Sequence, residues 1–374
     1  MKKNSVIKYL LGVLILVSIF LIAKDAPAPP APSGPFLSDY TAYPPFVVGS
    51  SDKANVMLLF SNDHTNYYKG YNDTIDIDNI DGDNDSSTGI DTTYKDTVEY
   101  YGYFDSNKCY TYSGGTFNPT SLATGANLHY CSGNWSGNFL NWATMTPVDF
   151  VRKALTGGKR VMDSATKTTL IRGNIYDLSH SWNKVYSGAD INQLTPYSGT
   201  YTFRNRGTLL YVRSGSYPDA TCDGTITTDW ACGDTGGSCI TTSCSTSFTV
   251  EVEVCNNTVG LEANCKTYQN VGVTTYKPAG LIVRYADQIR FGLMTYSVDS
   301  YMDKGGILRR NIEDTVNEIN PNGTINSGVA NSIIRYINEF NPKDWDPVAE
   351  MYYEAIRYFK ALAPTTTYRC GGGG

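Results

Sequence analysis

The sequence of this 374-residue chain predicts a mixed α/β fold, in which a doubly wound, partly parallel sheet is interrupted by a large β-rich insertion. Two apolar runs, Asn55–Phe60 and Ile289–Tyr296, lack polar alternation, which is typical of strands buried on both faces of a parallel sheet. A helix with one apolar face is expected between Asp346 and Leu362. The chain between the two strands is rich in Thr, Tyr, Ser and Gly, and it is expected to form short strands and turns.

The same features divide the chain into segments. Three lysines precede an apolar run of fifteen residues that ends at Ala23, which predicts a signal peptide because a stable membrane span needs about 20 residues. An uncleaved anchor is the alternative. We assign residues 1–23 to the signal peptide, 24–50 to an extended proline-rich linker, 51–66 and 276–374 to the α/β unit, and 67–275 to the insertion.

Within the insertion, alternating residues predict strands in Thr200–Val212 and Ser247–Val254. One helix is expected at Val148–Leu155, where the following Gly157 and Gly158 would end it. The tyrosine-rich stretches are interpreted as sheet surface, with an adhesive face as the alternative.

Two further helices flank the second buried strand. A helix around Pro278–Ala286 is expected just before that strand. For the last helix, Asp346 is a natural N-cap and Pro347 a natural first helical residue.

Nine cysteines in an exported chain indicate an oxidising compartment and a disulfide framework. Cys109 is predicted to pair with Cys131, and Cys255 with Cys265, because each pair joins the ends of a strand–turn–strand segment. Four more cysteines allow three pairings, of which we favour Cys222 with Cys232 and Cys239 with Cys244. Cys370 is left over, and the spacings of a structural zinc site are absent.

Charge and motifs exclude several classes of function. A net charge of -6 provides no basic field for a phosphate backbone, so nucleic acid is not expected as a partner. The three histidines, His64, His129 and His180, are far apart and fit no catalytic pattern. No nucleophile elbow or phosphate-binding loop is present either. We therefore expect that the protein is not an enzyme.

Several phrases of the sequence are characteristic of one family. Leu37–Phe46, followed by the strand at Asn55–Phe60, resembles the opening of PilY/PilC-type type IV pilus proteins. Further matching phrases follow in the family's order at residues 100–105, 135–146, 158–160, 252–255, 260–265, 277–281, 290–293 and 305–311. Together they span nearly the whole of the chain after the signal peptide.

This resemblance implies a von Willebrand factor A-like domain that carries a large insertion, on an exported protein. Where intact, such a domain binds Mg²⁺ or another divalent cation through a DxSxS motif after its first strand, a later threonine and a later aspartate. In this sequence the motif is altered. Ser61, Asp63 and Thr65 stand at its three positions, and Asp346 stands where the threonine would be. These four residues are a candidate site for Ca²⁺ or Mg²⁺, which prefer oxygen ligands. The alternative is a decayed site in which Asp346 is only a helix cap.

An acidic run offers a second candidate cation site. Alternating carboxylates in a loop with Gly and Asn can surround Ca²⁺, although the spacing does not fit an EF-hand, and a solvated loop is the alternative. The residues are Asp76, Asp78, Asp81, Asp83 and Asp85.

We thus expect an adhesin and assembly-promoting factor at the pilus tip or cell surface that contacts minor pilins and an outside surface or host receptor. The alternative is a periplasmic structural or regulatory subunit of the pilus machinery without external adhesion. The sequence ends soon after the last helix, before further strands of such a sheet, so we also expect a longer protein or a second polypeptide to complete the sheet.

Overall fold

A computed structural model describes residues 53–71, 93–175, 181–216, 246–299, 302–340 and 347–365. The predicted signal peptide and linker lie outside these ranges. Within the described part of the chain, no helix is long and apolar enough to cross a membrane.

A three-stranded sheet brings the two apolar runs together. Its order is β1–β14–β15, with β1 at Ala54–Phe60, β14 at Ile289–Asp299 and β15 at Met302–Glu313. The first two strands are parallel, in a register that pairs Ala54 with Ile289 and Phe60 with Thr295. The hairpin partner β15 runs antiparallel to β14. The predicted neighbours are therefore confirmed, although β14 is longer than expected.

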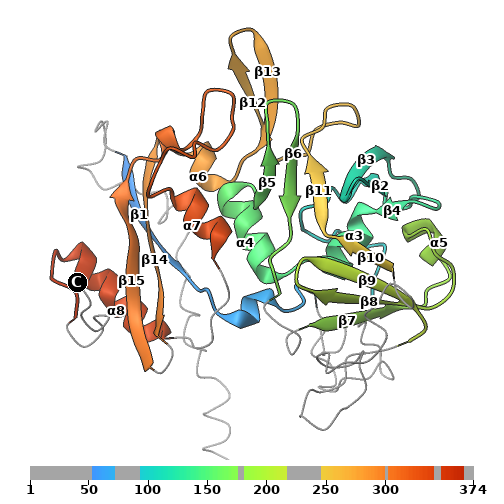
Figure 1. The fold of residues 1–374 in the computed structure, drawn as a ribbon, viewed down its shortest axis with the longest axis horizontal. Helices are drawn as coiled ribbons and strands as arrows, with labels where there is room; N and C mark the ends of the chain where they lie inside the picture. The colour runs from blue at the N-terminus through green and yellow to red at the C-terminus, as the bar shows by residue number, and fades with distance from the viewer. Residues whose placement is uncertain are drawn as a thin grey trace, which may run out of the picture. The chain divides into compact units, whose positions relative to one another are not determined.

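Helices pack on both faces of this sheet, as expected for strands without polar alternation, but β1 is only partly covered: Phe60 is buried, whereas Ala54, Asn55 and Leu59 are exposed. In Figure 1, α8 (Val348–Phe359) lies on one side of the sheet and α7 (Ile333–Glu339) on the other. Short helix α6 (Leu281–Arg284) and α4 (Pro147–Thr156) pack on the same side as α7. On that side the strands contribute Val56, Leu58, Phe60, Phe291 and Leu293, whereas Met57, Met294 and Tyr296 face Met351 and Ala355 of α8.

Helix α8 is covered on only part of its apolar surface. Met351 and Ala355 are buried against the sheet, but Tyr352 and Phe359 are 60% and 59% exposed. Val348, Ile356 and Leu362 are exposed as well. Strand β1 pairs with one neighbour among the described residues. Completion of the sheet by another polypeptide stays a prediction.

The start of α8 and the bounds of α6 differ from expectation. Pro347 is the N-cap of α8, so the helix begins at Val348, and Asp346 lies outside the described residues. Helix α6 is a single turn rather than the predicted Pro278–Ala286, because Pro278 ends strand β13, where it pairs with Cys265. Strand pairing has thus displaced the first part of the expected helix.

The chain between β1 and β14 forms three further sheets. The six-stranded sheet has the order β4–β2–β3–β11–β6–β5, and the four-stranded sheet the order β10–β9–β8–β7. A two-stranded ribbon pairs β12 with β13. The strands are β2 (Lys108–Ser113), β3 (Thr116–Leu122), β4 (Trp135–Ser136), β5 (Arg160–Asp163), β6 (Thr168–Ile171), β7 (Trp182–Tyr186), β8 (Tyr201–Arg206), β9 (Leu209–Ser214), β10 (Thr246–Thr249), β11 (Glu251–Val254), β12 (Cys265–Asn270) and β13 (Val273–Pro278).

Buried Val250 connects the two larger sheets. It separates β10 from β11, so the predicted strand Ser247–Val254 is in fact two strands in different sheets. Its N–H donates to the Thr208 carbonyl at 2.8 Å, and its own carbonyl accepts from Arg172 N–H at 3.1 Å. The change of sheet therefore leaves neither backbone group unpaired.

This segment contains more helix than its composition predicted. The expected helix is present as α4, which ends at Gly157 with φ of 94°. Helix α3 (Gly137–Thr144) and single-turn α5 (Ile191–Leu194) were not expected; two 3-10 turns also occur elsewhere, η1 at His64–Tyr67 and η3 at Val316–Glu318. All eight residues of α3 are buried, including its polar ones: Asn138 donates to the Val98 carbonyl at 2.8 Å, and Asn141 to the Tyr100 carbonyl at 2.7 Å.

Aromatic rings form the main core of this segment. Phe139 of α3 lies 5.3 Å from the ring centroids of Tyr94 and Trp142, and 5.1 Å from that of Phe203. Most contacts in the cluster are edge-to-face, the arrangement that favours aromatic pairs. Tyr94, Tyr103 and Tyr110 are buried. The interpretation of tyrosine as sheet surface is therefore wrong for these three residues.

Gly157 provides a test of this packing. A Cβ atom there would lie 2.5 Å from the Pro278 carbonyl oxygen, in a residue whose φ is +94°. We expect Gly157→Ala to lower the free energy of unfolding by about 2–4 kcal/mol, from the left-handed backbone and the forced contact together. Gly114→Ala is the matched control, because Gly114 also has positive φ (+62°) but no atom within 4 Å. Denaturant melts that show equal losses for the two variants would contradict the packing argument.

Candidate functional site

Three of the four residues predicted for the cation site lie in one turn at the carboxyl end of β1, the edge at which sites of parallel sheets are found. Asp63 accepts hydrogen bonds from the Thr65 N–H at 2.8 Å and from the Thr65 hydroxyl. Asp63 N–H donates to Ser61 Oγ at 3.2 Å. The fourth residue, Asp346, lies outside the described residues.

The Asp63 carboxylate already makes hydrogen bonds that stabilise this turn. It caps η1, it is 3% exposed, and its Oδ2 lies 3.2 Å from Nδ1 of His64. A cation would have to share oxygens that now accept hydrogen bonds.

A neighbouring oxygen fits a cation better. Asn62 is 6% exposed, and its Oδ1 is buried without a hydrogen-bond partner among the described residues. An unpaired buried acceptor costs free energy unless a donor or cation reaches it. Together with the oxygens of Ser61, Asp63 and Thr65, it makes an all-oxygen set of the kind that hard divalent cations accept. Sequence analysis missed Asn62 because the family motif does not use that position.

The second candidate cation site, the acidic run Asp76–Asp85, lies outside the described residues, as do Cys222, Cys232, Cys239 and Cys244. Both of the other predicted disulfides are present, Cys109–Cys131 and Cys255–Cys265.

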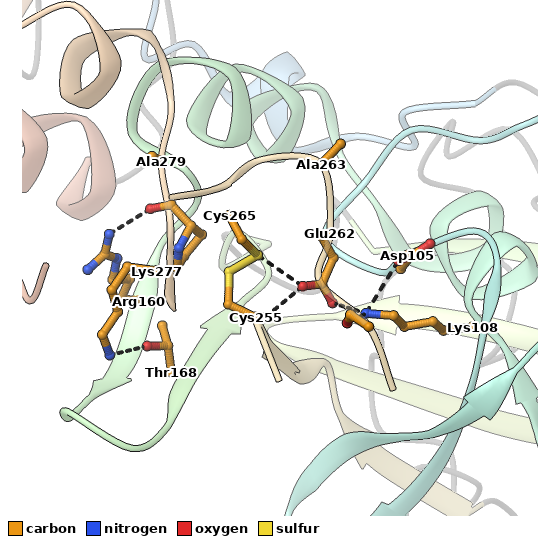
Figure 2. The surroundings of a disulfide bond; sticks show 12 residues. Asp105, Lys108, Arg160, Thr168, Cys255, Glu262, Ala263, Cys265, Lys277 and Ala279 are labelled. Carbon is orange, nitrogen blue, oxygen red and sulfur yellow. Dashed lines mark hydrogen bonds and ion pairs between the residues drawn. A yellow bond between two sulfur atoms is a disulfide. The ribbon is translucent and has the colours of Figure 1, made fainter. Parts of the chain in front are cut away.

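A buried ion pair connects the two disulfide-bonded loops (Figure 2). Lys108, which precedes Cys109, donates to Glu262 Oε1 at 2.8 Å, and the two side chains are 2% and 7% exposed. Asp105 lies 3.4 Å from the same ammonium. Glu262 belongs to the loop that Cys255–Cys265 closes, so the pair joins β2 to that loop.

Glu262 also contacts the disulfide itself. Its Oε2 accepts from the Cys255 N–H at 2.7 Å and lies 3.1 Å from Cys265 Sγ. Two cysteines and a carboxylate at such distances resemble a set of metal ligands. The sulfurs are bonded to each other, however, and a disulfide provides no thiolate. This cluster is therefore a structural junction in the oxidised protein.

A second buried ion group joins β5 and β6 to β13. Asp163 lies 3.0 Å from Nη1 of Arg160 and 3.2 Å from Nζ of Lys277. Lys277 also donates to Thr168 Oγ1 at 2.6 Å (Figure 2). Burial lowers the pKa of Lys277, and the adjacent Asp163 opposes this shift. Sequence analysis singled out none of these residues, because isolated charges between strands do not differ from surface charges in a sequence.

Comparisons with known proteins agree with this architecture. Residues 91–228 match the family model described as "PilY1 homolog, small alpha/beta domain". This chain is of the PilY1 type. Two proteins of Xylella fastidiosa (strain Temecula1 / ATCC 700964), both named "Type IV pilus biogenesis factor PilY1 homolog", are 34% identical over 378 residues and 30% identical over 339 residues. No solved structure matches the chain significantly.

The matches cover much of this chain and little of its relatives. The two alignments span 83% and 76% of the chain but 25% and 27% of the relatives. The PilY1-type chain thus spans about a quarter of the relatives' length. The matched domain lies inside the segment that we assigned to the insertion, and α3, α4 and α5 within it agree with an α/β description.

Removing one charge of the Lys108–Glu262 pair should be costly. We expect Glu262→Gln to lower the free energy of unfolding by about 3 kcal/mol, because the buried Lys108 ammonium then keeps only the more distant Asp105 as a counter-charge, beside the neutral Gly260 carbonyl at 2.6 Å. Lys108→Met combined with Glu262→Gln should recover at least half of this loss, since the Gln carbonyl can still accept from Cys255 N–H. Chemical denaturation of both variants under oxidising conditions measures the difference. An unchanged free energy of unfolding for Glu262→Gln alone would show that the Lys108–Glu262 pair contributes little to stability.

Proposed function

We propose that this PilY1-type protein acts in type IV pilus biogenesis as an exported, tip-associated adhesin that also promotes pilus assembly. The supporting observation is the similarity to two proteins named type IV pilus biogenesis factors, which extends over most of the chain. The two disulfides suit a protein that works outside the cytoplasm. Minor pilins and an external surface or receptor are the proposed partners.

The proposed role is binding rather than catalysis. Among the described histidines, His64 adjoins the cap residue Asp63, and Nδ1 of buried His129 donates to the Asp96 carbonyl at 2.6 Å. Neither belongs to a recognised catalytic sequence pattern. The alternative role is a periplasmic subunit of the pilus machinery that never contacts an outside surface.

The three-stranded unit supports the von Willebrand factor A-like part of the proposal. It has a parallel pair with an antiparallel third strand, helices on both faces, and a polar turn at the carboxyl end of β1. In this proposal Ser61, Asp63 and Thr65, with Asn62 and Asp346, would hold a divalent cation that modulates adhesion. Because Asp63 is also the cap of η1, we expect weak binding.

Localisation separates the two roles. A tagged chain should appear in pili that are sheared from cells and purified, and should be lost from that fraction in a strain that lacks the pilus fibre. Recovery only from the periplasm, with normal pilus assembly, would favour the machinery subunit. Recovery in sheared pili with unchanged surface attachment after deletion would contradict the adhesin role.

The cation site has its own test. Titration calorimetry with Mg²⁺ and Ca²⁺ should give weak binding that Asp63→Ala abolishes, with a loss of about 1 kcal/mol in unfolding free energy from the missing cap. Asp63→Asn is the control, because Asn caps equally well but has no charge for a cation. Micromolar affinity that survives Asp63→Ala would exclude this site.

A further inference from the structure

A cavity of about 350 Å³ lies between helix α7 and the start of strand β5. Its wall includes Lys159 and Arg160 from β5 and the residue before it, Arg335, Asn338 and Glu339 from α7, and the loop at 324–329. None of these residues belongs to the polar turn after β1, so the cavity is separate from the candidate cation site.

The carboxylate of Asp163, which also lines the cavity, is already occupied. It pairs with Arg160 at 3.0 Å and Lys277 at 3.2 Å, and it accepts from the Ile325 N–H at 2.7 Å. Asp163 therefore cannot neutralise further cations in the wall. Arg160, whose side chain is 1% exposed, still has a buried Nε–H without a partner among the described residues.

Two other cations of the cavity wall, Lys159 and Arg335, have few negative groups nearby to balance their charge. The Lys159 ammonium makes no hydrogen bond or ion pair within the described part of the chain. Arg335 donates to the Ala330 carbonyl at 2.7 Å, and its Nε lies 3.8 Å from Glu339, itself 66% exposed. Burial, together with nearby Arg152, lowers the pKa of Lys159, and Glu339 opposes this shift. An anion in the cavity would offset both the cost of burying the Lys159 ammonium and its repulsion from Arg152.

The charge balance indicates a monoanion. Among the residues that line the cavity, the three cations Lys159, Arg160 and Arg335 exceed the two carboxylates Asp163 and Glu339 by one charge. A doubly charged phosphate would meet the exposed Glu339 carboxylate, whereas a carboxylate can contact Lys159 and Arg335 and accept from the amide of Asn338. No aromatic ring is among the described residues that line the cavity, so nothing in that part of the chain would stack on a sugar. Its volume is near the lower limit for small-ligand sites, about 300 Å³, which suits one acidic side chain.

We propose that this cavity binds the carboxylate of an acidic peptide segment, with Lys159 and Arg335 as the opposing charges. The site is a contact for a partner protein that presents Asp or Glu, and it is independent of the proposed pilus role. The interaction weakens with salt, because both cations are partly open to solvent.

The test uses the full exported chain and acetyl-Glu-Glu-amide as the probe, followed by amide NMR shifts. We expect saturable shifts confined to residues 159–163 and 324–339, with about millimolar affinity, and no shifts with acetyl-Gln-Gln-amide. Lys159→Met and Arg335→Gln should each weaken binding about tenfold. Lys167→Met is the matched control, because Lys167 lies on the same β5–β6 hairpin but pairs with Glu253 at 3.4 Å, away from the cavity.

Any one of these results would overturn the proposal: no saturable shift with the acidic probe, equal shifts with the Gln probe, unchanged affinity in both cavity variants, or inorganic phosphate binding more tightly than the acidic probe. Matching thermal melts of the variants and the parent chain exclude misfolding as the cause of lost binding. A Lys167→Met loss equal to that of Lys159→Met would assign the effect to general surface charge and would also overturn it.

Discussion

The parallel pairing of β1 with β14 is the constraint on which the rest of the fold depends. It places Ala54 beside Ile289, so the whole intervening chain must leave the sheet and return to it. The entropy of closing a loop grows only slowly with its length, by about 0.6 kcal/mol for each doubling. A long insertion is therefore tolerable if it folds around its own core, and the aromatic cluster around Phe139 and Trp142 provides that core.

Buried cations then join the folded parts by donating to backbone carbonyls. Arg152 of α4 donates to the carbonyls of Ile337 and Phe340 at the end of α7, both at 3.0 Å. Arg172 donates to the carbonyls of Thr144, Gly207 and Leu209, and burial lowers its pKa to about 10. Burying a charge is costly unless it is well bonded, so these residues fix the junctions at which they lie.

Local signals in the sequence predicted local structure well. The apolar runs gave β1 and β14, the Gly157–Gly158 pair gave the end of α4, and short separations gave two disulfides. Helix α3 was not predicted because it has only eight residues, too few for a helical period to be distinguished from other patterns. The division of 247–254 into two strands was not predicted, because residues alternate in the same way in both strands. Only the backbone hydrogen bonds of Val250 show where one strand ends and the other begins.

The candidate site was predictable only in part, for a related reason. Ser61, Asp63 and Thr65 lie close together because they are neighbours in one turn after a strand, which any sequence of that kind would give. The Lys108–Glu262 pair and the cavity beside Lys159 depend on residues that only the tertiary fold brings together. A charge with a distant partner leaves no periodic or spacing signal, so neither could be derived from the sequence.

The positions of the disulfides also set an order of events during synthesis. Cys109–Cys131 and Cys255–Cys265 span only 22 and 10 residues, and both are complete before β14 has been made. At about 5–20 residues per second, β1 waits roughly 10–50 s for its partner strand. Oxidation can thus lock parts of the intervening chain while the apolar β1 is still unpaired. This topology therefore leaves the apolar β1 without its partner strand for most of the synthesis of the chain.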